Sequence, residues 1–185
     1  MMTSDPQSNY WYAIRTRSRA EKVVRDQLTG RAIEQFLPLV KRVSQWKDRK
    51  KVIEFALFQG YCFGRFCHDQ KLTVLQIPGV VEIVGSGHSP EPVLEEEIMA
   101  LQHAVGYPRA CEPHPYLEEG KSVLVLRGPF EGIKGTLVRK GDRCRLVLSI
   151  RLIRQSVAVH IDADDVTPIE KSCVGDSAVY SYEDL

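Results

Sequence analysis

The chain has 185 residues, 43% hydrophobic and 26% charged, a composition typical of a soluble globular protein with one or two domains. This excludes collagen, a coiled coil and extended disorder, and no stretch approaches the roughly 20 apolar residues of a membrane span. The net charge of +1 is the sum of two oppositely charged segments. Residues 15–51 form a basic block with 12 Lys and Arg against 4 Asp and Glu. Residues 82–119 form an acidic block with 1 Lys or Arg against 8 Asp and Glu. The basic block can approach a polyanion.

The first residues and the cysteines indicate the compartment. MMTSDPQSNY lacks the basic and apolar parts of a signal peptide. Five cysteines, an odd number at positions 62, 67, 111, 144 and 173, do not suggest a disulfide framework, and reduced thiols suit the cytoplasm. We therefore expect a cytoplasmic protein without a membrane segment, with residues 1–9 disordered.

Residues 10–105 are predicted to form an α/β domain with the order β-α-β-β-β-β-α. The run WYAIRT at 11–16 favours a strand. Ser18 and Glu21 form an S-x-x-E capping box before AEKVVRDQL, whose apolar spacing predicts a helix that ends at Gly30. The later elements expected are a charged hairpin over 42–55, a central strand over 55–66 with a bulge at Gly60, and a helix over 93–105.

A second, smaller unit follows a proline-rich break. Residues 106–119 hold three prolines and are predicted as a semi-extended linker whose two neighbours move independently. Residues 120–170 alternate short strands with glycine turns and show no helical period, which predicts a small all-β barrel. The tail, 171–185, is polar and expected to fray.

Four motifs in this order resemble the NusG-like transcription elongation factors. They are WYAIRTRSRAEKVVRDQL, LFQGYCF, IPGVVEIVG followed by EPVLEEEI, and VLRGPFEGIKGTLV with the strand SVAVHID. The resemblance spans Trp11 to Pro168 and implies an α+β two-domain protein, an α/β sandwich N-terminal domain followed by a small SH3-like KOW barrel. The stretch from Ile33 to Tyr61 is more similar to the specialised, operon-linked members of RfaH or UpxY type. Gln59 stands where the family usually has proline.

The resemblance implies that the first domain binds the clamp helices of the largest RNA polymerase subunit and suppresses pausing or termination. Motif position assigns this contact to Tyr12, Phe58 and Tyr61. A coiled-coil tip requires an apolar pocket with aromatic anchors. The residues alone leave open that these aromatics are core, as aromatics in strands usually are. Phe58 and Tyr61, three apart, share a pocket only if Gly60 forms a bulge.

Nucleic acid is the second partner expected, either upstream duplex or the displaced non-template DNA strand. The cations predicted to contact it lie at the first strand-helix junction and in the hairpin: Arg15, Arg17, Arg19, Lys22, Arg49, Lys50 and Lys51. Phosphate contacts alone give affinity without sequence choice. A solvated helix and hairpin is the alternative that the charge pattern leaves open.

The KOW domain is expected to bind a protein, since the family uses its GPF turn to contact ribosomal protein NusE or termination factor Rho. This carries over to Phe130, with Ile133 beside it. An exposed Phe in a glycine-bracketed turn suits a binding hot spot. The alternative is that Phe130 folds back as a plug on the barrel. Because β-branched residues fill SVAVHI, we expect no refolding of this domain into helices.

Other function classes find little support in the sequence. Nucleotide-binding, serine-hydrolase and zinc-protease motifs are missing, so we expect no enzyme and no cofactor. Cys62, Cys67 and His68 lack the paired C-x-x-C spacing of structural zinc, and we expect no metal. A housekeeping factor that couples polymerase to Rho or the ribosome remains an alternative. A ribosomal-type KOW RNA-binding protein is disfavoured, because residues 120–170 carry 9 Lys and Arg against 6 Asp and Glu. One site per polymerase suits a monomer.

Overall fold

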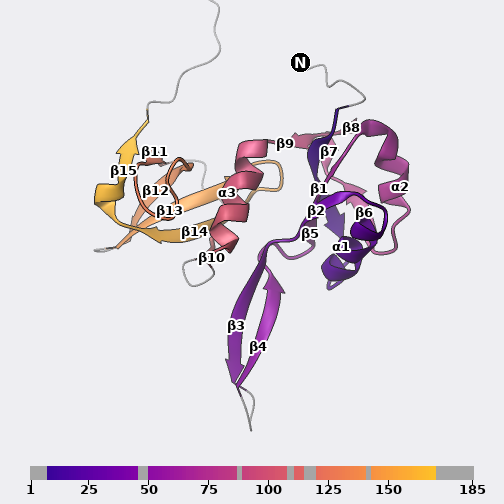
Figure 1. Ribbon diagram of the computed structural model, residues 1–185, viewed down its shortest axis with the longest axis horizontal. Helices are drawn as coiled ribbons and strands as arrows, with labels where there is room; N and C mark the ends of the chain where they lie inside the picture. The colour runs from indigo at the N-terminus through magenta and orange to yellow at the C-terminus, as the bar shows by residue number, and fades with distance from the viewer. Residues whose placement is uncertain are drawn as a thin grey trace, which may run out of the picture.

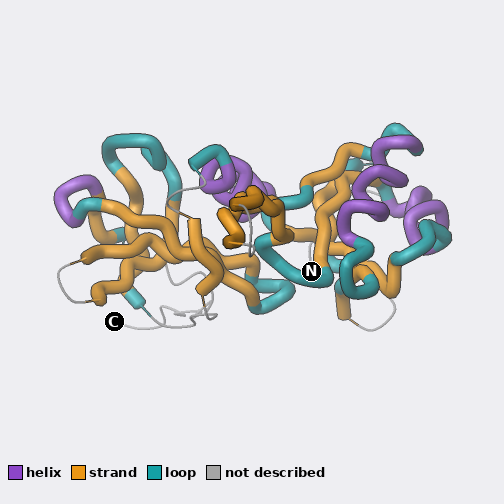
Figure 2. Tube along the Cα trace, turned by 90° about the horizontal axis from the view of Figure 1, so that it is seen from below, coloured by secondary structure: helices purple, strands orange, loops and turns teal. Residues whose placement is uncertain are grey.

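A computed structural model of the chain describes residues 8–45, 50–86, 89–107, 111–114, 120–140 and 143–169. Two antiparallel sheets lie at opposite ends of the molecule, and helix α3 (Glu95–Val105) lies between them (Figures 1 and 2). A two-stranded hairpin extends away from both sheets (Figure 1). We call the two sheets the N-terminal sheet and the C-terminal sheet.

The N-terminal sheet has the strand order β2-β5-β1-β6, with β9 paired to β1 beside β6. Its strands are β1 (Tyr10–Thr16), β2 (Glu34–Phe36), β5 (Tyr61–Phe66), β6 (Val80–Ile83) and β9 (Pro92–Val93). Two hairpins stand outside it, β3 (Leu39–Gln45) with β4 (Lys50–Ala56), and β7 (Gly85–Ser86) with β8 (Ser89–Pro90). The α/β character and the strand-helix start predicted from the sequence are confirmed.

Helices cover one face of this sheet. Val24 and Leu28 of α1 (Glu21–Gly30) and Val74 of α2 (Lys71–Leu75) are buried in one cluster with Ile14 and Cys62 of the strands. Helix α2 follows a short 3₁₀ turn, η1 (His68–Gln70), and was not predicted from the sequence. None of the helices among the described residues is long and apolar enough to cross a bilayer.

Two local predictions for this region are wrong. The stretch 55–66 is not one strand, because β4 ends at Ala56 and a turn precedes β5, with Gly60 at φ +79°. The capping box does not form. Instead the buried Glu21 carboxylate accepts a hydrogen bond of 2.8 Å from the Gly60 backbone N–H, so it ties α1 to that turn.

The C-terminal sheet has the order β10-β14-β13-β12-β11-β15. Its strands are β10 (Cys111–His114), β11 (Lys121–Val125), β12 (Lys134–Lys140), β13 (Arg143–Ile150), β14 (Gln155–Ile161) and β15 (Val166–Pro168), and the 3₁₀ turn η2 (Ala163–Asp165) precedes the last. The predicted closed barrel is not confirmed, since the edge strands β10 and β15 do not pair with each other in the described part of the chain. Both edge strands contain proline, which cannot donate a backbone hydrogen bond.

Strand β10 lies inside the segment 106–119 that the sequence predicts as a linker. It pairs antiparallel with β14, from Cys111 opposite Val159 to His114 opposite Ser156. An extended, proline-containing segment is suited to a sheet edge, where one side of the backbone needs no partner. The connection between the two sheets is therefore itself part of the C-terminal sheet.

Candidate protein and nucleic-acid interfaces

The N-terminal sheet presents an aromatic face on the side away from α1 and α2. We use this name for Trp11 of β1, Phe58 of the turn before β5, and Tyr61 and Phe63 of β5. Phe58 and Phe63 meet edge to face, with ring centroids 6.3 Å apart, and Tyr61 packs against the same cluster. The structure thus brings the predicted contact residues Phe58 and Tyr61 to one surface, across the turn at Gly60.

Tyr12 does not join them. Neighbouring strand residues point to opposite faces, and Tyr12 lies on the α1 side, where its ring centroid is 4.7 Å from that of Phe66. Only 4% of Tyr12 is exposed, and burial raises the pKa of its hydroxyl. In this structure Tyr12 is a core residue, the alternative that the sequence left open for it.

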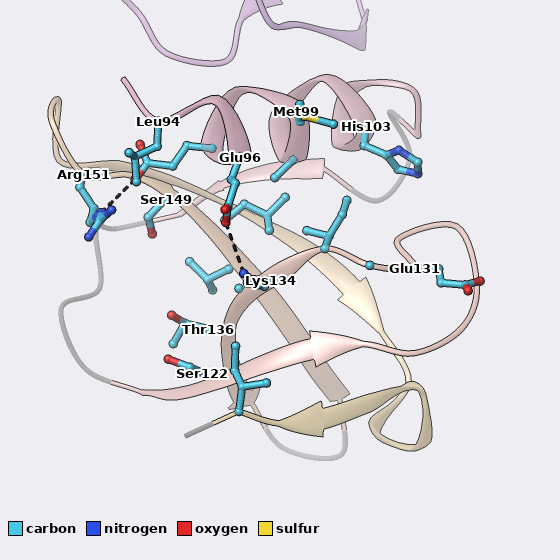
Figure 3. Close-up of a pocket in the computed structure, with 18 residues that line it drawn as sticks. Leu94, Glu96, Met99, His103, Ser122, Glu131, Lys134, Thr136, Ser149 and Arg151 are labelled. Carbon is cyan, nitrogen blue, oxygen red and sulfur yellow. Dashed lines mark hydrogen bonds and ion pairs between the residues drawn. The ribbon is translucent and has the colours of Figure 1, made fainter. Parts of the chain in front are cut away.

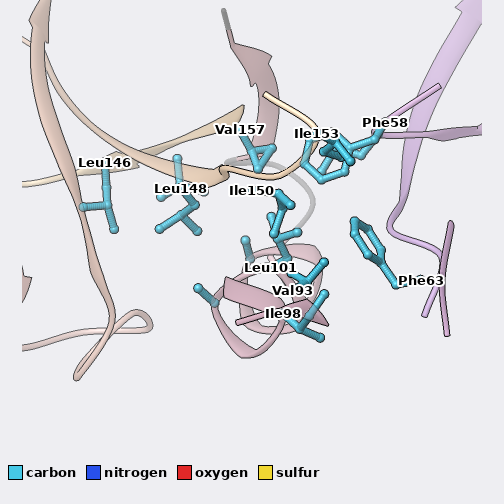
Figure 4. Close-up of a cluster of buried hydrophobic side chains, with 14 of the residues drawn as sticks. Phe58, Phe63, Val93, Ile98, Leu101, Leu146, Leu148, Ile150, Ile153 and Val157 are labelled. Carbon is cyan, nitrogen blue, oxygen red and sulfur yellow. The ribbon is translucent and has the colours of Figure 1, made fainter. Parts of the chain in front are cut away.

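Helix α3 and the C-terminal sheet cover the aromatic face. Phe58 is 1% exposed and belongs to a buried cluster with Leu101 of α3, Ile150 of β13 and Ile153 of the β13–β14 turn. Figure 4 shows Phe58 and Phe63 directed toward Ile153 and α3. The predicted polymerase contact is therefore an internal interface in this arrangement, which we call closed.

The same helix covers the turn predicted to bind the second protein partner. Phe130 is 4% exposed, and its ring centroid lies 5.9 Å from His103 and 5.4 Å from Tyr107 at the end of α3. His103 Nε2 is hydrogen bonded to the Pro129 carbonyl. Ile133 packs partly buried against the cluster. Phe130 therefore folds inward, as in the alternative that the sequence left open, and it packs against α3 as well as against its own sheet.

A groove of about 640 Å³ runs between α3 and the C-terminal sheet (Figure 3). Two ion pairs join its sides, Lys134 Nζ to Glu96 Oε2 at 3.5 Å and Arg151 Nε to Glu97 Oε1 at 3.0 Å. Burial raises the pKa of the Glu97 carboxyl, and the Arg151 guanidinium opposes this shift. Both cations are largely exposed to solvent, so each ion pair stabilises the closed arrangement only weakly.

The predicted nucleic-acid cations at the β1–α1 junction are exposed but not equivalent. Arg15 pairs with Glu82 at 3.0 Å, and Lys22 pairs with Glu54 of the hairpin at 3.4 Å. Arg17 and Arg19 are exposed and make no ion pair with another described residue. The side chains of Arg49, Lys50 and Lys51 fall outside the described part of the structure.

The two cysteines whose side chains are described differ in access. Cys62 is fully buried, and burial raises the pKa of its thiol to about 12, with a smaller contribution from the Glu21 carboxylate. Cys67 is partly exposed, and both its backbone N–H and its thiol donate to Gln70 Oε1. No group of three His, Cys, Asp or Glu close enough to hold a metal is present among the described residues.

Cys62 is expected to resist alkylation in the folded protein, because the reactive thiolate forms only as the pH approaches about 12. Iodoacetamide at pH 8 should label Cys67 within minutes and leave Cys62 unmodified until denaturant is added. Peptide mass mapping reads each position separately. Labelling of both at the same rate in native buffer would contradict the buried position of Cys62.

Three comparisons with known proteins point to one family. The family described as "Transcription termination factor nusG" matches residues 9–102. The "Transcription termination/antitermination protein NusG" of Campylobacter jejuni is 26% identical over 164 residues, 82% of this chain and 92% of that protein. The protein of the same name from Rickettsia felis is 26% identical over 177 residues, 89% and 92% of the two chains. The solved structure "Domain interaction in Thermotoga maritima NusG" has a TM-score of 0.50 and 22% identity, and covers 90% of this chain and all of that one.

These matches define a transcription termination and antitermination factor with the NusG-like fold of mixed helix and sheet. The family match covers just over half of the chain, and the curated relatives cover most of the rest. The chain belongs to the NusG family.

Proposed function

We propose that this protein is a transcription elongation and antitermination factor that binds the clamp helices of the RNA polymerase largest subunit through its aromatic face. The observation that carries this proposal is that Phe58 and Tyr61 lie on one surface beside Trp11 and Phe63. Aromatic anchors on a rigid sheet supply large contact areas, and such residues dominate protein interfaces. Membership of the NusG family supports the assignment.

The closed arrangement adds a requirement to this function. Phe58 cannot touch a partner while Ile150 of β13 and Ile153 of the β13–β14 turn pack in the same buried cluster. Polymerase binding therefore requires that the C-terminal sheet move away from the aromatic face. The same movement frees Phe130 from His103 and Tyr107.

We further propose that residues 10–105 form the polymerase-binding domain and residues 120–170 an SH3-like KOW domain that recruits NusE or Rho. Glycine turns with Phe130 and Ile133 support the second assignment. In this proposal Phe130 and Ile133 contact the partner after the C-terminal sheet has separated from α3. The cations of the β1–α1 junction and of the hairpin contact upstream duplex or the non-template strand.

A single-round transcription assay with bacterial RNA polymerase tests the proposed function. Two templates are compared with and without the protein, one generic and one carrying the leader of the operon beside this gene. Read-through on that leader alone would establish a specialised factor of RfaH or UpxY type. An equal effect on both templates would establish a general NusG-type factor. No effect on either template, together with no binding to polymerase, would overturn the proposal.

Tyr61→Ala is expected to weaken polymerase binding by about 1 to 3 kcal/mol, as truncation of an interface anchor does. Tyr61 is only partly buried in the closed molecule, so the variant should fold normally. A pull-down with a clamp-helix fragment measures the affinity. If the variant binds the fragment with the same affinity as the wild-type protein, Tyr61 is not part of the contact surface.

Exchange of both Arg17 and Arg19 for Glu is expected to lower the slope of log affinity for DNA against log salt by about 2, one for each lost phosphate contact. The same exchange at Arg31, at the far end of α1, is the control and should leave the slope unchanged. Fluorescence anisotropy with a duplex at several salt concentrations measures the slope. If the wild type, the double variant and the Arg31 control have equal slopes, the β1–α1 junction does not contact the nucleic acid.

A further inference from the structure

The β3–β4 hairpin has two faces with different surroundings. Its strands pair in register from Leu39 opposite Ala56 to Gln45 opposite Lys50. Residues directly opposite each other share a face, and the faces alternate along the strands. Leu39 and Ala56 pack against the cluster beneath α1. Val40, the next residue, belongs to the cluster of the aromatic face.

The hairpin therefore continues both sides of the N-terminal sheet. Lys41 and Glu54 occupy the α1 side, where Glu54 pairs with Lys22 of α1. Phe55, opposite Val40, occupies the side of the aromatic face. The apolar side of the N-terminal sheet thus continues onto the hairpin at Val40 and Phe55.

Phe55 differs from the other apolar residues on its side in its exposure. Phe58 is 1% exposed and Val40 is 4% exposed, whereas 40% of Phe55 is open to solvent. The buried apolar surface thus extends as far as Val40, and Phe55 lies accessible at its border. A partner that needs this surface meets Phe55 before it can reach Phe58.

We propose that Phe55 is a contact residue for the protein that binds Phe58 and Tyr61, and that it makes the first contact while the molecule is still closed. This inference rests on the proposed function. The occupant is an apolar helical tip of the polymerase, because Phe55 is continuous with the aromatic face through Val40. A contact that has already formed in the transition state for association lowers the barrier to binding, so its loss slows association and leaves dissociation nearly unchanged.

Binding kinetics of the full chain with bacterial RNA polymerase test the proposal. Phe55→Ala is expected to slow association about fivefold and to change dissociation less than twofold, because the contact forms before the rate-limiting opening. Phe55→Leu should restore most of the rate, since it restores the apolar contact. Val52→Ala is the matched control, because Val52 lies on the same strand, is 59% exposed and occupies the opposite face. Its rates should equal those of the wild type.

The outcomes separate this inference from the proposed function. If Tyr61→Ala weakens binding but Phe55→Ala behaves like Val52→Ala, the role of Phe55 is overturned and the proposed function stands. If the wild-type protein does not bind polymerase, both fail. The hairpin is also basic, with six Lys and Arg against two Asp and Glu over residues 41–54. Weakened binding of Phe55→Ala to single-stranded DNA, with polymerase kinetics unchanged, would make Phe55 a base-stacking residue and overturn the proposal.

Discussion

Phe58→Ala is expected to lower the free energy of unfolding by about 3 to 5 kcal/mol, because the side chain is 1% exposed and its removal leaves a cavity in the shared cluster. Urea denaturation followed by circular dichroism measures this loss. Phe55→Ala, on the neighbouring exposed site, should cost less than about 1 kcal/mol, as surface substitutions do.

The comparison of these two variants also tests the closed arrangement itself. If the C-terminal sheet did not cover Phe58 in solution, both rings would border solvent and the two losses would be similar. Equal losses below about 1 kcal/mol would therefore contradict the closed arrangement.

Ile153→Asp is expected to open the molecule and to strengthen polymerase binding about tenfold or more, because an unpaired carboxylate among Phe58, Leu101 and Ile150 is strongly disfavoured. Ile153 lies in a turn between β13 and β14, so the carboxylate reaches water as soon as the sheets separate. The C-terminal sheet itself should remain folded. Because Ile153→Asp is expected to bind polymerase more tightly, its effect differs from that of a variant that unfolds and loses binding.

Hydrogen exchange of the aromatic face and a polymerase pull-down measure the two effects of Ile153→Asp. Leu126→Asp adds the same charge to the C-terminal sheet at a site that is 48% exposed, and it should change neither measurement. Unaltered polymerase binding in Ile153→Asp, with increased exchange at β5, would show that closure does not limit the contact.

The first strand was predicted from its β-favouring residues, and the first helix from the regular spacing of its apolar residues. The family resemblance is confirmed as well. Four consecutive residues of β1, Trp11 to Ile14, are all buried, so no alternation of apolar and polar residues shows which face of the sheet each side chain occupies. The family motif groups Tyr12 with Phe58, although the two side chains lie on opposite faces of the sheet.

The remaining differences arise from contacts between distant segments. Nothing local in GPFEGIKG shows that Tyr107 and His103 cover Phe130. Likewise, the S-x-x-E pattern could not reveal that Glu21 binds the Gly60 N–H, 39 residues away. Local patterns predict elements, whereas the packing of one element on another depends on the whole chain.

The pairing of β10 with β14 also fixes how far the two sheets can part. Only residues 106–110 join the end of α3 to β10, and a fully extended backbone of that length reaches about 20 Å. So short a tether keeps the C-terminal sheet at a high effective concentration beside α3, and even a weak interface then holds the molecule closed. Wider separation requires that β10 detach from β14, so the stability of a four-residue edge strand sets the reach of the released domain.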